Sequence, residues 1–207
     1  MAQVTTGLRA MLSSPAGYNV VQNLLGANRS RAILVREHIR PTAGATVLDI
    51  GCGTAELLKF LPRDINYQGF DLSEPYIEAA RAAHGDRGSF HCRDVGERAA
   101  EGAAGAADLI LAIGLLHHLD DDQATGLLRT AHELLKPGGR LISVDGTLQP
   151  GQPALARYLI LKDRGQNIRS PENYAKLGEG VFAEPRCTVR QDLLFVPYTH
   201  CVLEFTK

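Results

Sequence analysis

Cysteine is scarce in this sequence, and its placement excludes two classes of protein. The four cysteines among the 207 residues are far apart and form no Cys-x-x-Cys pair, which argues against a structural zinc site and against a disulfide scaffold. Long apolar runs are also missing: no stretch approaches the roughly 20 residues that span a bilayer, and no signal-like segment opens the sequence. We therefore expect reduced thiols, a cytoplasmic location and no membrane insertion.

An excess of either charge is lacking as well. The sequence has 22 basic and 23 acidic residues, a net charge of −1, and neither a Lys/Arg stripe nor a basic tail. Such a balance lacks the electrostatic footprint of a nucleic-acid binder and favours a small-molecule substrate. The length and the 44% content of hydrophobic residues fit one globular domain with a full core.

The central feature is a short apolar segment that runs into a glycine-rich turn. Residues 46–50 read as a buried strand, the turn contains Gly51, Cys52 and Gly53, and a helical pattern follows at 56–61. Strand, tight loop and helix in this order form the opening of a nucleotide-binding unit. Glycine lacks a Cβ, so we expect a ligand to lie against the backbone N–H groups of this turn.

The residues around the turn distinguish two kinds of nucleotide. A dinucleotide fingerprint requires a third glycine where Glu56 stands, and a carboxylate there would repel a pyrophosphate. The pattern from Asp49 to Ala55 is Asp-x-Gly-x-Gly-x-Ala, which resembles the first motif of the class I S-adenosylmethionine-dependent methyltransferases. Ala55 departs from the glycine most common at that place. A nicotinamide-dependent oxidoreductase and a non-catalytic S-adenosylmethionine-binding protein remain alternatives.

Acids follow the next two predicted strands. Asp71 ends the strand expected at 66–72, where a carboxylate accepts hydrogen bonds from the ribose hydroxyls of a bound nucleoside. The strand expected at 89–95 carries Asp94, and the family resemblance implies that Asp94 and the N–H of Val95 contact adenine. Small residues at the end of the fourth strand would let the methionine portion approach the main chain. The predicted cofactor contacts in the sheet are therefore Asp49, Gly51, Cys52, Gly53, Asp71, Leu72, Asp94, Val95, Ala112 and Ile113.

The first 40 residues are expected to form a helical cap. Apolar positions recur at helical spacing between 19 and 39 with a break at 26–28, which predicts two helices. In the family that the sequence resembles, such a cap often closes over the methionine end of the cofactor, so we include Tyr18 and Arg31 among the cofactor contacts. A solvated helix face is the alternative for the arginine. We expect residues 41–207 to form the methyltransferase domain.

Two histidines follow the predicted fourth strand. His117 and His118 suggest a general base, although Leu-His-His-Leu at this place also resembles a packing feature of small-molecule methyltransferases. A metal site is not expected because no third ligand stands nearby. We take His117 as the first candidate for a general base and Asp145, at the end of the fifth strand, as the second.

The segment LKPGGRL at 135–141 extends the resemblance, which then covers residues 44–146. It implies a seven-stranded, Rossmann-like, doubly wound α/β sheet with five parallel strands and a C-terminal antiparallel hairpin, expected at 188–194 and 200–206. The expected activity is methyl transfer from S-adenosylmethionine to a small molecule, yielding S-adenosylhomocysteine. The fourth strand is not followed by Asn/Asp-Pro-Pro-Tyr, which argues against methylation of DNA bases or glutamine amides. The substrate candidates beyond the shared core are Arg164, Asn167, Arg169, Tyr198 and His200.

Overall fold

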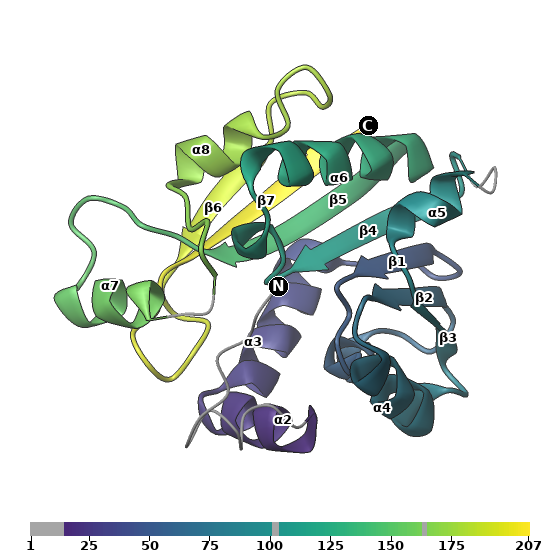
Figure 1. The fold of residues 1–207 in the computed structure, drawn as a ribbon, viewed down its shortest axis with the longest axis horizontal. Helices are drawn as coiled ribbons and strands as arrows, with labels where there is room; N and C mark the ends of the chain where they lie inside the picture. The colour runs from purple at the N-terminus through teal and green to yellow at the C-terminus, as the bar shows by residue number, and fades with distance from the viewer. Residues whose placement is uncertain (1–14, 101–103, 163–164) are drawn as a thin grey trace.

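The computed structural model of the chain describes residues 15–100, 104–162 and 165–207, and its centre is a seven-stranded sheet (Figure 1). The strands lie in the order β3-β2-β1-β4-β5-β7-β6. Strands β1 to β5 are parallel, and β7 runs antiparallel between β5 and β6. The predicted Rossmann-like sheet with a C-terminal hairpin is thus confirmed. The strands are β1 (Thr46–Ile50), β2 (Asn66–Asp71), β3 (Gly88–Cys92), β4 (Ala107–Ile113), β5 (Leu135–Gly146), β6 (Arg186–Arg190) and β7 (His200–Thr206).

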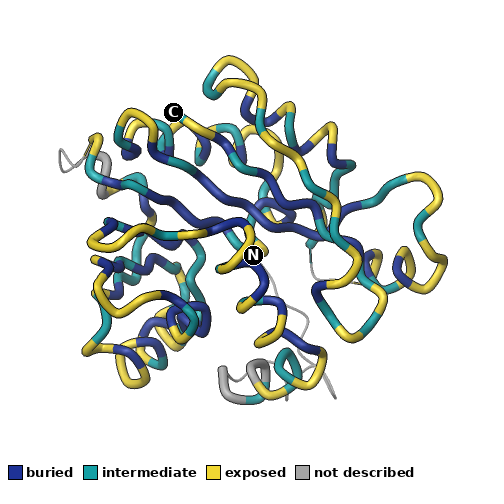
Figure 2. The backbone as a smooth tube through the Cα atoms, turned by 180° about the vertical axis from the view of Figure 1, so that it is seen from behind, coloured by how far each residue is buried: buried dark blue, intermediate teal, exposed yellow. Residues whose placement is uncertain are grey.

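The sheet is buried on both faces because helices cover each side. Successive side chains of a strand point to opposite faces, and in β1 the neighbours Val47 and Leu48 belong to two separate apolar clusters. Figure 2 shows the central strands as a continuous buried band. This burial explains why β1 and β4 are almost uninterrupted apolar runs. The helical segments are α2 (Pro15–Leu24), α3 (Ala27–Leu34), η1 (Val35–Ile39), η2 (Glu56–Phe60), α4 (Glu74–His84), α5 (Val95–Ala100), η3 (Leu116–His118), α6 (Asp121–Leu134), α7 (Ala154–Leu161) and α8 (Pro171–Lys176).

The helix expected after the glycine turn is shorter than its sequence pattern indicates. Segment η2 is a 3₁₀ turn of five residues, preceded by Ala55 in the left-handed region at φ 55°. Pro62 lies just beyond its end, and the residue before a proline is disfavoured in the helical region. The apolar residues of η2 still pack into the core.

The two N-terminal helices are separated at Gly26, whose φ of 99° is readily adopted by glycine. The backbone N–H of Phe195 donates to the carbonyl of Leu25, and Arg29 donates to the carbonyl of Asp192. The N-terminal helices therefore contact the connection between β6 and β7. No helix among the described residues has the length and apolarity needed to cross a bilayer.

Several element boundaries differ from the sequence-based expectation. Strand β3 ends at Cys92 rather than at residue 95, and Val95 begins α5. Strand β6 ends at Arg190 rather than at residue 194, because the Arg190 guanidinium pairs with Asp192 at 2.7 Å where the chain turns away. Strand β5 begins at Leu135, directly after α6, and includes the Pro-Gly-Gly segment, a sequence typical of the loop that ends a helix. A register shift between Ala107 and Leu109 of β4 accommodates this early start.

Candidate active site

The predicted site residues gather at one edge of the sheet. The glycine turn follows β1, Asp71 ends β2, Asp94 follows β3, His117 lies in η3 beyond β4, and Asp145 is near the end of β5. Parallel strands present their carboxyl ends on the same side, which is where open α/β sheets bind ligands. The structure therefore collects residues from five segments of the chain at a single edge.

The glycine turn does not offer the backbone N–H groups that the sequence suggested. The N–H groups of Gly51 and Cys52 both donate to the carbonyl of Phe70, at 2.7 and 3.0 Å, and that of Gly53 donates to Asp71 Oδ2 at 2.9 Å. These donors hold the turn against β2. A ligand would therefore meet the Cα atoms and carbonyls of the turn. Among the described residues, no atom lies within 4 Å of a Cβ built on Gly53, at φ 54°, so these residues leave open space beside the turn there.

Asp71 both shapes the turn and faces the edge of the sheet. Its Oδ2 accepts from Gly53, and its Oδ1 accepts from the N–H of Ser73 at 2.8 Å. A carboxylate has about four acceptor sites, so capacity remains for ribose hydroxyls. The next side chain, Leu72, is 71% exposed, which leaves a large apolar surface beside the carboxylate. Such a surface suits the flat face of an adenine ring.

Asp49 lies beneath the turn rather than at its surface. Its carboxyl group is buried and accepts a hydrogen bond of 2.7 Å from the hydroxyl of Tyr67. Burial raises the pKa of Asp49 to about 7, an effect that the Tyr67 hydrogen bond opposes. Cys52 is turned inward, because its sulfur lies against Gly69, and burial raises the pKa of its thiol.

The other predicted cofactor contacts differ in exposure. Asp94 is exposed, and its Oδ1 accepts from the N–H of Gly96 at 2.6 Å. Val95 and Ala112 are buried, so only their backbone atoms can reach a ligand. Ile113 is partly buried at the end of β4.

The N-terminal candidates remain predictions. Arg31 donates to Asn23 Oδ1 at 3.1 Å and to Asn28 Oδ1 at 3.0 Å, which places its guanidinium among the residues of the cap. The backbone of Tyr18 belongs to α2, and its side chain lies outside what the structure describes.

The two candidates for a general base form one pair. His117 Nδ1 lies 2.8 Å from Asp145 Oδ1, and the backbone N–H of His117 donates to the same oxygen at 3.2 Å. Asp145 Oδ2 accepts from the hydroxyl of Ser143 at 3.1 Å. Both members of the pair are buried, with His117 7% exposed and Asp145 2% exposed. A carboxylate in this position selects the tautomer with the proton on Nδ1 and orients the ring.

Ser143 and Tyr67 are partners that sequence reasoning missed. Ser143 precedes Asp145 by two positions on β5, so both side chains point to the same face of the sheet. Tyr67 pairs with Val47 in the register of β1 and β2, and its ring extends towards Asp49. The alternation along β5 was a usable signal for Ser143, whereas the approach of Tyr67 required the register between strands.

The substrate candidates are placed around the same edge. Tyr198 and His200 pack ring to ring at 4.7 Å, and the Tyr198 hydroxyl lies 2.5 Å from where a Cβ of Gly146 would stand. Asn167 and Arg169 lie on the segment that follows α7 and contact η3. Arg164 lies outside the described residues.

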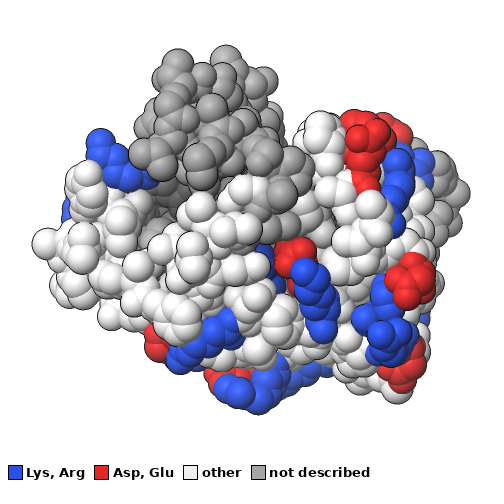
Figure 3. All heavy atoms as spheres, turned by 90° about the horizontal axis from the view of Figure 1, so that it is seen from below, with Lys and Arg blue, Asp and Glu red and all other residues white. Residues whose placement is uncertain are grey.

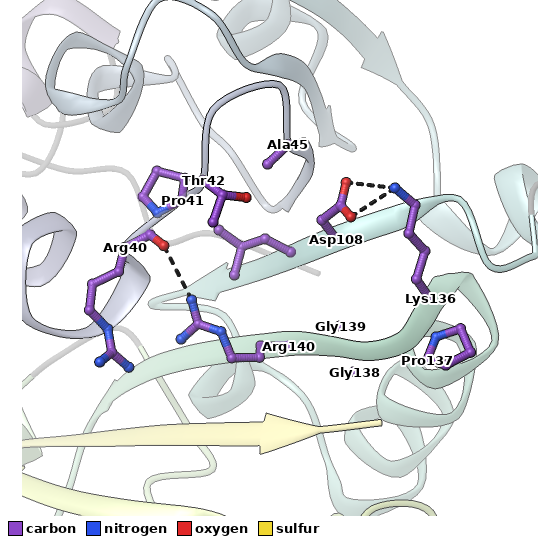
Figure 4. A pocket seen from close by; sticks show the side chains of 11 residues that line it. Arg40, Pro41, Thr42, Ala45, Asp108, Lys136, Pro137, Gly138, Gly139 and Arg140 are labelled. Atoms are coloured by element: carbon purple, nitrogen blue, oxygen red, sulfur yellow. Dashed lines mark hydrogen bonds and ion pairs between the residues drawn. The ribbon is translucent and has the colours of Figure 1, made fainter.

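A separate hollow of about 230 Å³ lies at the opposite end of the strands. Figure 4 shows Lys136 reaching Asp108 across this hollow, at 2.7 Å, and Arg140 directed at the backbone of Arg40. Its cations are engaged within the chain, and the predicted site residues are at the other edge. Within the described ranges, no group of three or more His, Cys, Asp or Glu residues is placed to hold a metal ion.

Similarity to known proteins agrees with this arrangement. Residues 48–141 match a family model described as a methyltransferase domain. The chain is 32% identical over 133 residues to the ubiquinone biosynthesis O-methyltransferase of Xanthomonas axonopodis pv. citri. This match covers 62% of this chain and 54% of that protein. It is 29% identical over 140 residues to phosphoethanolamine N-methyltransferase 1 of Triticum aestivum, covering 66% of this chain and 28% of that protein. The chain thus spans about half the length of the first relative and less of the second.

Solved structures share the whole fold at low sequence identity. The 1,6-didemethyltoxoflavin-N1-methyltransferase of Burkholderia thailandensis, solved with 1,6-didemethyltoxoflavin and S-adenosylhomocysteine, superposes with a TM-score of 0.69 at 22% identity. The superposition covers 100% of this chain and 92% of that one. The matching domain, the related sequences and the strand order agree. Residues 48–141 are thus similar to a methyltransferase domain, and the described fold is that of the class I S-adenosylmethionine-dependent methyltransferases.

Proposed function

We propose that this chain transfers a methyl group from S-adenosylmethionine to a hydroxyl group of a small molecule. The observation that carries the proposal is the pair formed by His117 and Asp145 at the carboxyl edge of the sheet. A hydroxyl is a weak nucleophile at neutral pH and must lose its proton as it attacks. A base oriented by a carboxylate suits that requirement.

The residues of the turn and of β2 suit the cofactor. S-adenosylmethionine, when bound, supplies a methyl group that its sulfonium makes electrophilic. The open space beside Gly53, the acceptor sites of Asp71 and the exposed face of Leu72 fit an adenosyl group. Next to the turn, Glu56 Oε2 accepts a hydrogen bond of 2.7 Å from Lys59 Nζ. The carboxylate of Glu56 disfavours a pyrophosphate at this place. These features favour S-adenosylmethionine over a nicotinamide dinucleotide.

The role of the pair is proton transfer. Asp145 accepts a hydrogen bond from Nδ1 of His117. Nε2 is therefore the ring atom that takes the proton of the substrate hydroxyl. Ser143 and the backbone N–H of His117 bond to the same carboxylate and restrict its rotation. The sheet thus holds the base in one orientation, which lowers the entropic cost of reaching the reactive geometry.

The named relatives support an oxygen acceptor but also suggest a nitrogen acceptor. One relative is called an O-methyltransferase, and the other an N-methyltransferase. A cytoplasmic location and the exclusion of nucleic acid also belong to the proposal. Figure 3 supports the second point, because Lys and Arg side chains are interspersed with Asp and Glu on the face viewed from below.

Two measurements test the proposal. Calorimetric titration with S-adenosylhomocysteine and with NAD should show binding of the first alone; binding of NAD alone would contradict the cofactor assignment. A panel of phenols, aliphatic alcohols and amines is then incubated with S-adenosylmethionine, and product is followed by homocysteine release. Turnover with hydroxyl compounds is expected. Cofactor binding without any turnover would favour a non-catalytic binding protein, and turnover of amines alone would move the acceptor to nitrogen.

A further inference from the structure

We propose that Arg169 is a positioning residue that holds the His117 turn in register with Asp145, an inference that rests on the proposed function for its catalytic consequence. Residue 169 was expected to contact substrate. Its guanidinium is instead directed into the protein, with the side chain only 9% exposed.

The guanidinium of Arg169 holds both sides of the His-His turn. Nη1 donates to the carbonyl of Leu116 at 2.9 Å, and Nη2 donates to the carbonyl of Leu119 at 2.8 Å. These two carbonyls flank His117 and His118. The guanidinium also donates to Asp121 Oδ1 at the start of α6, from Nε at 2.8 Å and from Nη2 at 2.7 Å. One side chain therefore joins the ends of the turn to the following helix.

The backbone of Arg169 is fixed to the strand that carries Asp145. Its carbonyl accepts from the hydroxyl of Thr147 at 2.8 Å and from the N–H of Leu148 at 3.4 Å. These residues directly follow the end of β5. The guanidinium also lies 5.6 Å from the ring centre of Tyr174, whose hydroxyl donates to the carbonyl of Gly146 at 3.0 Å. Arg169 thus bridges the two segments whose ends meet in the pair of His117 and Asp145.

The residues beside Arg169 reinforce this bridge. The N–H of Asn167 donates to the carbonyl of His117 at 3.0 Å, and the carbonyl of Asn167 accepts from Arg169 Nη1 at 3.0 Å. Gly165 packs against the His117 ring so closely that a Cβ there would collide with it. The segment 165–169 is therefore a strap across the base, and Arg169 is its anchor.

The chemistry of the anchor requires arginine. A guanidinium presents several donors in a fixed plane, whereas a lysine ammonium is a compact charge that cannot span two carbonyls and a carboxylate at once. An Arg169→Lys variant keeps the charge and loses the span. The distance between His117 and Asp145 should then vary, and small misplacements at a reacting group can lower the rate by up to about 100-fold.

The test follows the His117 ring directly, so it does not depend on knowing the acceptor. Ring nitrogen NMR of the full chain, assigned with His117→Gln, reports the tautomer and the titration of the imidazole. Wild type should show one tautomer, protonated at Nδ1. Arg169→Lys should show shifted or broadened His117 signals and an altered titration, with unchanged affinity for S-adenosylhomocysteine. With any acceptor that is turned over, kcat should fall about 10- to 100-fold with little change in KM.

Two controls separate positioning from general damage. Arg140→Lys changes another arginine that holds backbone carbonyls, those of His38 and Ile39, at the far end of the sheet, and it should leave His117 unchanged. Asp121→Asn weakens the exposed side of the anchor and should shift the His117 signals in the same direction but less, whereas the exposed neighbour Asp122→Asn should not.

The outcomes distinguish this inference from the proposed function. Wild-type His117 signals in Arg169→Lys, or the same change in Arg140→Lys, would overturn the positioning role. If no acceptor is methylated and S-adenosylhomocysteine does not bind, the proposed function is contradicted. The His117 ring signals would still test the positioning role of Arg169.

Discussion

His117 Nδ1 and Asp145 Oδ1 lie 2.8 Å apart, although the two residues are 28 positions apart in the sequence. They come from the ends of neighbouring parallel strands, so the pairing of β4 with β5 brings them together. The carboxylate is buried and holds both the ring and the backbone N–H of the histidine. Burial of a charged group is costly without such partners, which indicates that the two residues stabilise one another.

Replacing His117 with Gln should lower kcat by about 10²- to 10⁴-fold, the contribution of a general base. Asp145→Asn should also lower kcat, because an amide in place of the carboxylate no longer favours the Nδ1 proton. Affinity for S-adenosylhomocysteine should change little in either variant, since both act on the acceptor. Initial rates and calorimetry on the same samples check this.

The neighbouring histidine provides a matched control. His118 is exposed, and its ring packs at 4.1 Å from that of His117. His118→Gln should retain most of the activity. A loss in His118→Gln as large as in His117→Gln would show that the turn is sensitive as a whole, and would remove the case for a specific base.

The sequence predicted the sheet edge well because strand ends are local features. An apolar run followed by Asp or Gly marks where a buried strand meets the ligand side, and this rule correctly located Asp71 and Asp145. The same rule placed the glycine turn after β1, but it did not reveal that the N–H groups of the turn are taken by Phe70 and Asp71. Hydrogen bonds between strands depend on register, which a single sequence does not show.

Tertiary contacts also explain the different reading of Arg169. A polar loop between helices indicates only that the segment is near the surface. The side chain turns inward because the carbonyls of Leu116 and Leu119 face it. These acceptors belong to a distant segment, so residue type and spacing could not assign the contact.

Gly53→Ala should weaken cofactor binding more than it destabilises the fold. Gly53 has a φ of 54°, and an alanine there pays about 1–2 kcal/mol for the left-handed backbone. Its Cβ would also enter the open space beside the turn. Affinity for S-adenosylhomocysteine should therefore fall beyond any loss of folded protein, measured by calorimetry together with urea unfolding.

Gly44→Ala is the matched control for this prediction. Gly44 has a φ of 72°, and a Cβ there would also have no atom of the described part of the chain within 4 Å, but Gly44 precedes β1 at the opposite edge of the sheet. The two variants should lose similar stability, while only Gly53→Ala loses affinity. Equal affinities would mean that the cofactor does not approach Gly53.

Asp71→Ala should weaken cofactor binding by about 1–3 kcal/mol through lost charge-assisted hydrogen bonds. The same carboxylate holds the N–H of Gly53, so part of the effect comes from a looser turn. Titration with S-adenosylhomocysteine measures the affinity, and the exposed Asp86→Ala serves as control. Unchanged affinity in Asp71→Ala would place the ribose elsewhere.

Asp49 should make the fold less stable as pH rises through the weakly acidic range. Its pKa is raised to about 7 in the folded chain, mainly by burial, and is about 3.9 in an unfolded chain. The folded state then holds a proton that the unfolded state has lost, so the contribution of Asp49 is complete below about pH 4 and disappears by about pH 7. Asp49→Asn keeps an acceptor for Tyr67 and removes this titration. Urea unfolding at pH 5 and pH 8 should show a larger loss for wild type than for Asp49→Asn; equal losses would refute the shift.

Cys187 should be the first thiol to react with iodoacetamide at neutral pH. It is exposed, its sulfur lies 3.4 Å from that of Cys201, and this contact lowers the pKa of Cys187 while raising that of Cys201. The pKa values of Cys52 and Cys92 are also raised, the first mainly by burial and the second mainly by a hydrogen bond with Glu74. The thiolate is the reacting species. Cys187 has a lowered pKa, which favours the thiolate, and its side chain is exposed to the reagent. Peptide mass spectrometry after brief labelling checks the order. Cys187→Ser should leave the buried Cys201 slow to react. Earlier labelling of Cys52 or Cys201 than of Cys187 in the wild type would contradict the opposite pKa shifts of Cys187 and Cys201.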